Sequence, residues 1–253
     1  MIQSRGLVVA LLCLAVLLGG CQAAGLMDRI LGGDEASPTA TPYAASLRVD
    51  NAHVCSAIIV SGTKLVTTAH CTQRELKQIV PSRISCRVGS TNQYAGGRIV
   101  YVESVTVHPD YYELQNNVAV ITLTSALAFT DRIQAVALAS GDDELPAVGS
   151  AVSVAGWGRT VEGSNSYKIR ELALTVAAEA DCLDAYSGHD SSSFCLAHAL
   201  RQGTCHGDGG SGAVYNDKLI GLSHFVVGAC GSRYPDVFVR VSSFHDWLQQ
   251  QIA

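Results

Sequence analysis

Charged residues are scarce in this sequence. Only 15% of its 253 residues are Asp, Glu, Lys or Arg, whereas 48% are hydrophobic. A chain of this length and hydrophobicity can bury a large core as one domain or as two small ones, which excludes a disordered protein. The formal net charge is −5 at pH 7, and no stretch concentrates basic residues. We therefore expect no nucleic-acid partner.

Long hydrophobic runs are also missing, apart from one near the start. After Arg5, an apolar run extends to Leu18 and is followed by small residues. The run is too short for a comfortable membrane span, and its flanks are typical of a secretory signal peptide over residues 1–24. We therefore expect a secreted, extracellular protein without membrane contact after signal removal. The alternatives are a buried core helix and a bacterial lipoprotein site that lipidates Cys21.

Helical periodicity is nearly absent before the last ten residues. Short stretches rich in β-branched and aromatic residues alternate instead with turn residues. The expected strands are 53–60, 64–68, 83–88, 98–107, 118–123, 151–155, 171–177, 219–226 and 237–241. Ser242 and Ser243 precede a helical pattern from about 244 to 252. Many short strands with a terminal helix indicate an all-β sandwich or barrel.

The cysteine count is odd once the signal peptide is removed. Of nine cysteines, Cys13 and Cys21 precede the mature chain and seven remain, so one thiol is expected to be unpaired in an oxidising compartment. Cys86 shares one face of an expected strand with Ile84 and Val88, as a small core residue would. The alternative for this residue is an intermolecular disulfide.

The stretch 205–212 reads Cys-His-Gly-Asp-Gly-Gly-Ser-Gly. It resembles the nucleophile loop of the chymotrypsin-like serine proteases (trypsin family, peptidase S1), Cys-x-Gly-Asp-Ser-Gly-Gly-Pro. Gly209 stands where that family carries its serine. Aligning Ser211 there would need a gap, whereas the residues on both sides fit without one. Activity through Ser211 is the alternative, but its displacement would misalign hydroxyl and base.

Three further motifs occur in the order of this family: 30–33 resembles its activation junction, 67–71 its histidine motif and 155–158 its Ala-Gly-Trp-Gly segment. The resemblance covers roughly 30–253. It implies two six-stranded antiparallel β-barrels with a cleft between them and a C-terminal α-helix. Barrel one is expected at about 43–131, barrel two at about 132–241 and the helix at about 244–252. The resemblance also implies three disulfides: Cys55 with Cys71, Cys182 with Cys195, and Cys205 with Cys230.

The resemblance places the catalytic positions at His70, Asn117 and Gly209. His70 is the retained base, whereas Asn117 replaces the acidic residue and Gly209 the nucleophile. In the triad the carboxylate holds the imidazole tautomer, and its change to an amide lowers kcat by about 10⁴-fold. We therefore expect that the chain is not an enzyme but an inactive pseudoprotease. The backbone N–H groups of Gly207 and Gly209 are expected to keep the family's oxyanion hole.

The resemblance also implies an activation step. Cleavage after Arg29, at the end of a short segment 25–29, would free Ile30. In the family the new ammonium is buried against the Asp before the nucleophile, which is Asp208 here. Because burying an ion pair costs several kcal/mol per ion, such a pair acts as an order switch more than as a stabiliser.

The primary side-chain pocket is assigned by resemblance to three residues. Gly203 occupies the position that is Asp in trypsin-like members, so no preference for basic side chains is expected there. Val226 stands at a position of the pocket wall that is usually Gly, so it should narrow the pocket. Asp236 is expected to place a carboxylate near the base of the pocket. We expect a preference for small or polar side chains.

Histidines gather around the expected cleft. His224 stands where the family has a serine beside the triad, and His206 precedes the oxyanion hole. With His70 they make three imidazoles, which could form a zinc site. The alternative is that His224 fills the space left by the missing hydroxyl and that His206 points to water. None of the spacings is a metal motif, so we expect no metal and no cofactor. The remaining histidines show only strand-end or surface character.

The function expected from these residues is that of a secreted, non-catalytic serine protease homologue of the arthropod type. It would act as a binding or regulatory module in extracellular proteolysis. Its expected partners are secreted proteins, such as active serine proteases, their substrates or their inhibitors. One alternative is an active serine-type endopeptidase with atypical catalytic residues. Another is a binder of metal or small anions in the cleft.

Overall fold

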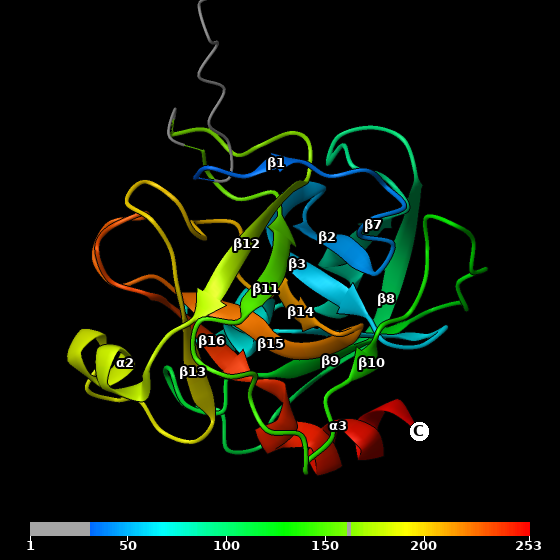
Figure 1. The fold of residues 1–253 in the computed structure, drawn as a ribbon. Coiled ribbons are helices and arrows are strands. Elements are labelled where there is room, and N and C mark those ends of the chain that lie inside the picture. Colours follow the sequence, from blue (N-terminus) through cyan, green and yellow to red (C-terminus); the bar gives the residue numbers. More distant parts are fainter. Residues whose placement is uncertain (1–30, 161–162) are drawn as a thin grey trace, which may run out of the picture.

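The computed structural model describes residues 31–160 and 163–253. The expected signal peptide 1–24, the segment 25–29 and the junction residues Arg29 and Ile30 lie outside the described residues. Most secondary structure in the described part is β-strand (Figure 1). No helix in this part is long and apolar enough to cross a membrane.

Six antiparallel strands close into the first barrel in the order β2-β3-β4-β9-β8-β7. They are β2 (Ala44–Val49), β3 (Ala52–Ile59), β4 (Lys64–Thr67), β7 (Ile84–Val88), β8 (Arg98–Val107) and β9 (Ala119–Leu123). A small hairpin of β5 (Gln73–Arg74) and β6 (Lys77–Gln78) and two 3₁₀ turns, Ala69–Thr72 and Pro81–Arg83, lie between β4 and β7. The turn Ala69–Thr72 carries the expected base, His70.

The second barrel follows in the chain and closes in the order β12-β11-β14-β15-β16-β13, because β13 also pairs with β12. Its strands are β11 (Ala151–Gly156), β12 (Arg170–Val176), β13 (Ser193–Ala197), β14 (Gly212–Tyr215), β15 (Lys218–Phe225) and β16 (Asp236–Arg240). Two short strands extend this sheet: β1 (Asp34–Glu35) pairs with β12, and β10 (Ala137–Leu138) pairs with β15. The expected class, two six-stranded antiparallel barrels, is therefore confirmed.

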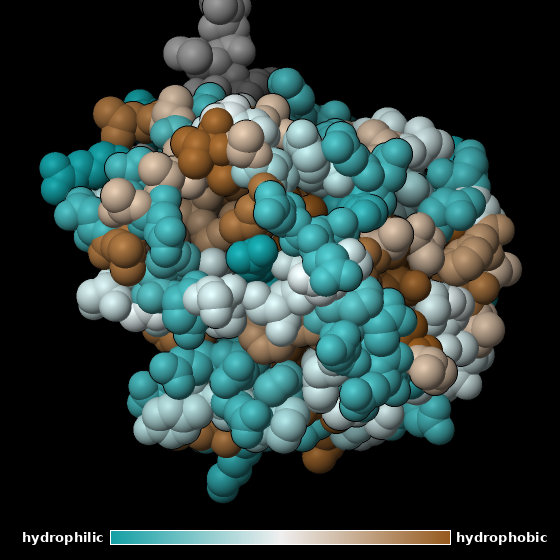
Figure 2. All heavy atoms as spheres, turned by 60° about the horizontal axis from the view of Figure 1, so that its bottom comes forward, coloured by the Kyte–Doolittle hydropathy of each residue, from teal (hydrophilic) through white to brown (hydrophobic). Residues whose placement is uncertain are grey.

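One hydrophobic cluster joins the two barrels and the C-terminal helix. Val120 comes from the first barrel, Leu219 and Val239 come from the second, and Leu248 comes from α3 (His245–Ile252). A 3₁₀ turn at Val241–Phe244 leads into α3, which lies below the barrels in Figure 1. The face around α3 is mostly hydrophilic, with small hydrophobic areas between polar ones (Figure 2). The shared cluster fixes the barrels relative to each other and so positions the cleft between them.

Some short or fully buried strands and one short helix were not predicted from the sequence. All six residues of β2 are buried, so the strand lacks the alternation by which a half-buried strand is recognised. β2 is covered on both edges by β3 and β7. The helix α2 (Glu179–Ala185) has only seven residues, too few for a helical period to stand out. The strands β13 and β14 are also short and were not expected.

The described residues contain three disulfides, Cys55–Cys71, Cys182–Cys195 and Cys205–Cys230. These are the pairings that the resemblance implies. Cys86 is a free thiol in the core of the first barrel, with no exposed surface, and burial raises its pKa to about 12. Because a buried, protonated thiol is inert, this location favours the small core residue over the intermolecular disulfide.

Truncation of a core side chain tests the packing of the first barrel. Leu65 in β4 is fully buried, whereas Leu200 is 71% exposed. Leu65→Ala is expected to lower the free energy of unfolding by about 2–5 kcal/mol, because it removes buried methyl groups and leaves a cavity. The same change at Leu200 should alter it by less than about 0.5 kcal/mol. Urea unfolding of both variants measures the difference, and equal effects would contradict this packing.

Candidate functional site

The loop 205–211 is held by a buried carboxylate. Asp208 is 1% exposed, and its two carboxylate oxygens accept the N–H groups of Gly158 (2.7 Å) and Cys205 (3.0 Å). Burial raises the pKa of Asp208 to about 7, although the two N–H donors oppose this shift. A Cβ at Gly158 would lie 2.1 Å from the carboxylate, so this position has to be glycine. The Ala-Gly-Trp-Gly motif therefore provides the wall against which Asp208 lies.

Hydrogen bonds of the loop also fix the direction of two peptide planes. The carbonyl of His206 accepts the Arg159 N–H, and the carbonyl of Asp208 accepts the Ser211 N–H, both at 2.8 Å. The described peptides are trans, and in a trans peptide the N–H points away from the carbonyl. The N–H groups of Gly207 and Gly209 are thereby turned away from these partners. Neither N–H donates to an acceptor within 31–160 or 163–253.

His53 supports the same loop from the first barrel. Its Nε2 donates to the carbonyl oxygen of Gly207 (3.1 Å), so its Nδ1 accepts the hydroxyl of Ser46 (2.8 Å). Burial lowers the pKa of His53 to about 4, so the ring is neutral at pH 7. The expectation of mere surface or strand-end character is wrong for this residue. No local signal reveals the role, because its partner lies 154 residues further along the chain.

Asn117 fixes the tautomer of His70. Its Oδ1 accepts the backbone N–H of His70 and its Nδ2 faces Nδ1 of the ring, each at 2.9 Å. The backbone N–H can only donate, so the amide cannot be flipped, and Nδ1 of the ring must be the acceptor. Burial lowers the pKa of His70, which keeps the ring neutral. The single ring proton is therefore on Nε2, the opposite of the tautomer in a serine protease triad.

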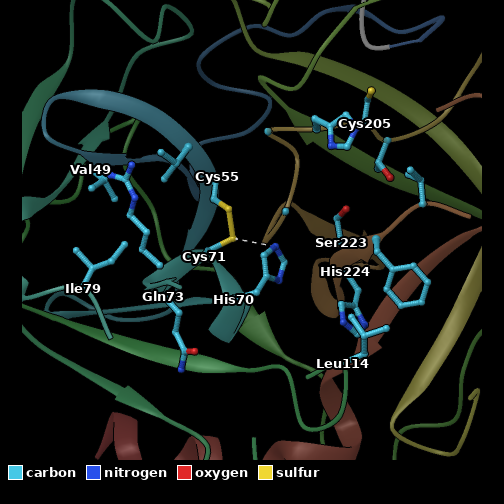
Figure 3. A pocket seen from close by; sticks show the side chains of 18 of the residues that line it. Val49, Cys55, His70, Cys71, Gln73, Ile79, Leu114, Cys205, Ser223 and His224 are labelled. Carbon is cyan, nitrogen blue, oxygen red and sulfur yellow. Dashed lines mark hydrogen bonds between the residues drawn. A yellow bond between two sulfur atoms is a disulfide. The ribbon is translucent and has the colours of Figure 1, made fainter. Parts of the chain in front are cut away.

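Gly209 lies beside the edge of this ring that carries Nε2. A Cβ at Gly209 would be 2.8 Å from Nε2 of His70 and 3.1 Å from Sγ of Cys71. Nε2 itself lies 3.5 Å from that sulfur (Figure 3). Gly209 brings no hydroxyl to this point. The hydroxyl of Ser211 is fully buried and donates to Ser56 Oγ at 2.9 Å, so it does not replace one.

A cavity of about 720 Å³ opens at this point between the barrels. Figure 3 shows His70 between the Cys55–Cys71 disulfide and His224. The lining includes Val49, Val54, Ile79, Leu114, Phe225 and Val226 among apolar residues, and Gln73, Arg74, Thr204, His206 and Ser223 among polar ones. Gly207 and Gly209 also line it. The predicted cleft residues that meet in this cavity are His70, His206, Gly207, Gly209, His224 and Val226.

The pocket base differs from the arrangement expected by resemblance. Val226 lines the cavity, whereas Gly203 and Asp236 lie behind Thr204 and do not. Asp236 is 1% exposed and accepts the N–H and the hydroxyl of Thr204. Its other oxygen lies 3.3 Å from Nε2 of His198. The carboxylate expected at the base therefore already has partners.

His198 is a second histidine that is not a surface residue, since only 1% of its side chain is exposed. Burial lowers the pKa of His198, but its hydrogen bond and charge interaction with Asp236 outweigh this, and the pKa is raised overall. His108, by contrast, packs its ring against Phe244 and Trp247. The contact with the Asp236 carboxylate therefore stabilises the protonated form of His198.

Ligand atoms for a metal are grouped once in the described residues, at Cys55, His70 and Cys71, whose ligand atoms lie within 4.8 Å of one another. The two sulfurs are joined in a disulfide, so they provide no thiolate for a metal. His224 stacks on His70 with ring centroids 6.3 Å apart. Burial, with a smaller effect of His70, lowers the pKa of His224 to about 3.

The two closed barrels, with a histidine turn facing a glycine loop across the cleft, define the chymotrypsin-like class. The Trypsin family model matches residues 30–248, so the chain belongs to the trypsin family. It is 30% identical to Trypsin alpha of Drosophila erecta, over 96% of both chains. It is 33% identical to Serine protease SP24D of Anopheles gambiae, over 92% of this chain and 86% of that protein.

The fold is also found among solved structures. Mouse neuropsin, a serine protease, superimposes with a TM-score of 0.78 over 87% of this chain and 99% of its own, at 21% identity. This similarity concerns the fold.

The substitutions at Asn117 and Gly209 led us to expect that the chain is not an enzyme. The relatives that span nearly the whole chain are instead named as trypsins and as a serine protease, which contradicts that expectation. The expectation failed because it rested on two side chains, whereas the relatives match over the whole domain.

Replacement of His53 tests the support of the loop. The native pKa of about 4 lies below the value of about 6.5 for an unfolded chain, so the unfolded state takes up the proton first. The stability that neutral His53 contributes is complete above pH 6.5 and is lost as the pH falls towards 4. Between pH 7 and pH 5 the protein should therefore lose about 2 kcal/mol more unfolding free energy than His53→Gln.

Urea unfolding of both proteins at the two pH values measures this difference. Glutamine is a suitable replacement because its amide can still donate to Gly207 but does not titrate. An identical pH effect in the two proteins would show that His53 is not buried as a neutral ring.

Proposed function

We propose that this trypsin-family domain is extracellular and that its cleft binds polypeptide segments, so that it acts as a binding or regulatory module in extracellular proteolysis. The observation that carries the proposal is the 720 Å³ cavity between the barrels, which combines apolar walls with two unpartnered backbone N–H groups. Apolar walls with a few fixed polar groups are typical of ligand sites. The proposed partners are secreted proteins: active serine proteases, their substrates or their inhibitors.

Secretion and activation are part of this proposal. Residues 1–24 would direct export, and three disulfides suit an oxidising compartment. Cleavage after Arg29 would place a new ammonium at Ile30, one residue before Leu31, whose carbonyl accepts the Gly203 N–H. This ammonium would pair with Asp208 and stabilise the charged form of its carboxyl group, whose pKa burial raises to about 7.

A second candidate is hydrolysis of the bound polypeptide. The names of the relatives favour it, because they are trypsins and a serine protease. The two candidates share the cleft and differ in whether the bound chain is cleaved. Both are tested with the same samples.

Filling the cleft tests polypeptide binding. Val226 lines the cavity, whereas Val148 is 67% exposed on the surface. Val226→Trp is expected to weaken binding of fluorescein-labelled octapeptides at least about tenfold, because the indole occupies space that the peptide needs. Val148→Trp, the matched control, should bind as the parent does. Fluorescence anisotropy measures binding, and mass spectrometry of the same samples detects cleavage. Equal loss in both variants, or no loss in either, would contradict the location.

Introducing a serine at position 209 and a carboxylate at 117 tests the hydrolytic frame. The double variant Gly209→Ser, Asn117→Asp is expected to react with a fluorophosphonate probe at least about 100-fold faster than the parent. The three atoms nearest to the new Cβ are His70 Nε2 and the two disulfide sulfurs, and the His70 ring lines the cavity into which it can shift. The single variant Asn117→Asp is the control. Equal labelling of the parent and the double variant would place the reactive group elsewhere.

A further inference from the structure

Hydrogen-bond donors converge at the centre of the cleft. Gly207 and Gly209 line the cavity, and their N–H groups have no acceptor in the described chain. Gly207 has a φ of +96°, a conformation that glycine adopts without strain, and the N–H group of Asp208 between the two glycines donates to the Cys205 carbonyl. Because the neighbouring carbonyls are bonded to Arg159 and Ser211, the loop cannot turn these donors inward without losing both bonds.

His70 adds a third donor. Asn117 occupies Nδ1, so the proton on Nε2 points to the cavity side, where its one described partner is the Cys71 sulfur at 3.5 Å. A disulfide sulfur is a weak acceptor and does not satisfy an N–H group. The Gly209 Cβ position lies 2.8 Å from this nitrogen, so the third donor is next to Gly209. Two donors without an acceptor and a third with only a weak sulfur acceptor favour an anionic group with two oxygens.

A fourth group of the cavity lacks a partner. His224 is 7% exposed, and its Nε2 is buried without a hydrogen bond in the described structure. Leaving a buried polar atom unpaired is unfavourable, which indicates a polar ligand or water in this space. The described lining contains no Asp or Glu, whereas it includes Arg74. The charge at the cavity therefore also favours an anion.

We propose that the cleft binds the C-terminal carboxylate of a polypeptide chain, with the carboxylate on the N–H groups of Gly207, Gly209 and His70. The inference rests on the proposed binding of polypeptides and names the part of the chain that is recognised. The apolar lining residues accommodate the preceding side chains: Val49 and Ile79 lie across the cavity from Leu114 (Figure 3), and Phe225 and Val226 also line it. Such chain ends are the products of proteolysis, so the domain would recognise chains that a protease has already cut.

Two peptides of one sequence test the proposal. A fluorescein-labelled hexapeptide ending in serine is compared at pH 8 with a free carboxylate and with a C-terminal amide. The carboxylate form is expected to bind at least about tenfold more tightly, because hydrogen bonds to a charged group are the stronger ones. Acetate and inorganic phosphate serve as competitors, and each should bind at least about 100-fold more weakly than the peptide.

A charge-matched pair of variants tests the role of His70. In Asn117→Asp the new carboxylate would accept a hydrogen bond from the Nδ1–H group and leave Nε2 as an acceptor, which removes the third donor. It should weaken binding of the carboxylate peptide at least about tenfold and leave the amide peptide unchanged. Asn116→Asp adds the same charge one position earlier, where the side chain bonds the Asp110 carbonyl and not His70, and should have little effect on either peptide.

The outcomes separate this inference from the proposed function. Equal affinity for the two peptides overturns the carboxylate site and leaves polypeptide binding intact. Binding of neither peptide overturns both. Acetate or phosphate bound as tightly as the peptide would make this a site for small free anions and would overturn the chain end as its ligand. Equal weakening by both Asp variants would show that charge alone acts, without the His70 donor.

Discussion

The burial of the Asp208 carboxylate is the interaction on which the geometry of the cleft depends. It lies against the backbone of 156–158 and accepts one N–H group from that segment, at Gly158, and one from the loop itself, at Cys205. Leaving a buried carboxylate without such partners costs several kcal/mol, so loop and wall have to form together. The consequence is a rigid loop in which the N–H groups of Gly207 and Gly209 are directed to the cavity. His53 holds the same loop from the other barrel, which makes the cleft a product of both barrels.

The second constraint is the amide at position 117. A carboxylate there would hold the proton of His70 on Nδ1 and leave Nε2 free to accept one. The amide does the reverse, because its oxygen is already committed to the backbone N–H of the same residue. His70 therefore acts as a donor beside the two loop amides. The fold of the trypsin family determines where these groups lie. The local hydrogen bonds determine whether each group is a hydrogen-bond donor or acceptor.

Local pattern was sufficient for much of the fold but not for the links between distant segments. β8, in which buried Val100 and Val102 alternate with exposed residues, was predicted from its sequence. β2 was not, because a strand that is buried throughout shows no alternation. His70, Asn117 and Gly209 were found through family motifs. His53 and His198 were missed, since each has a partner, Gly207 or Asp236, that only the fold brings near.

The most direct test of this account is the tautomer of His70, observed by ¹⁵N NMR of the histidine side chains at pH 7.5. The account predicts a neutral ring that carries its proton on Nε2, since Asn117 Nδ2 donates to Nδ1. The variant Asn117→Asp provides the reference spectrum for the opposite form. A proton on Nδ1 of the unaltered protein would contradict the account, because the cleft would then present a base at Nε2 rather than a third donor.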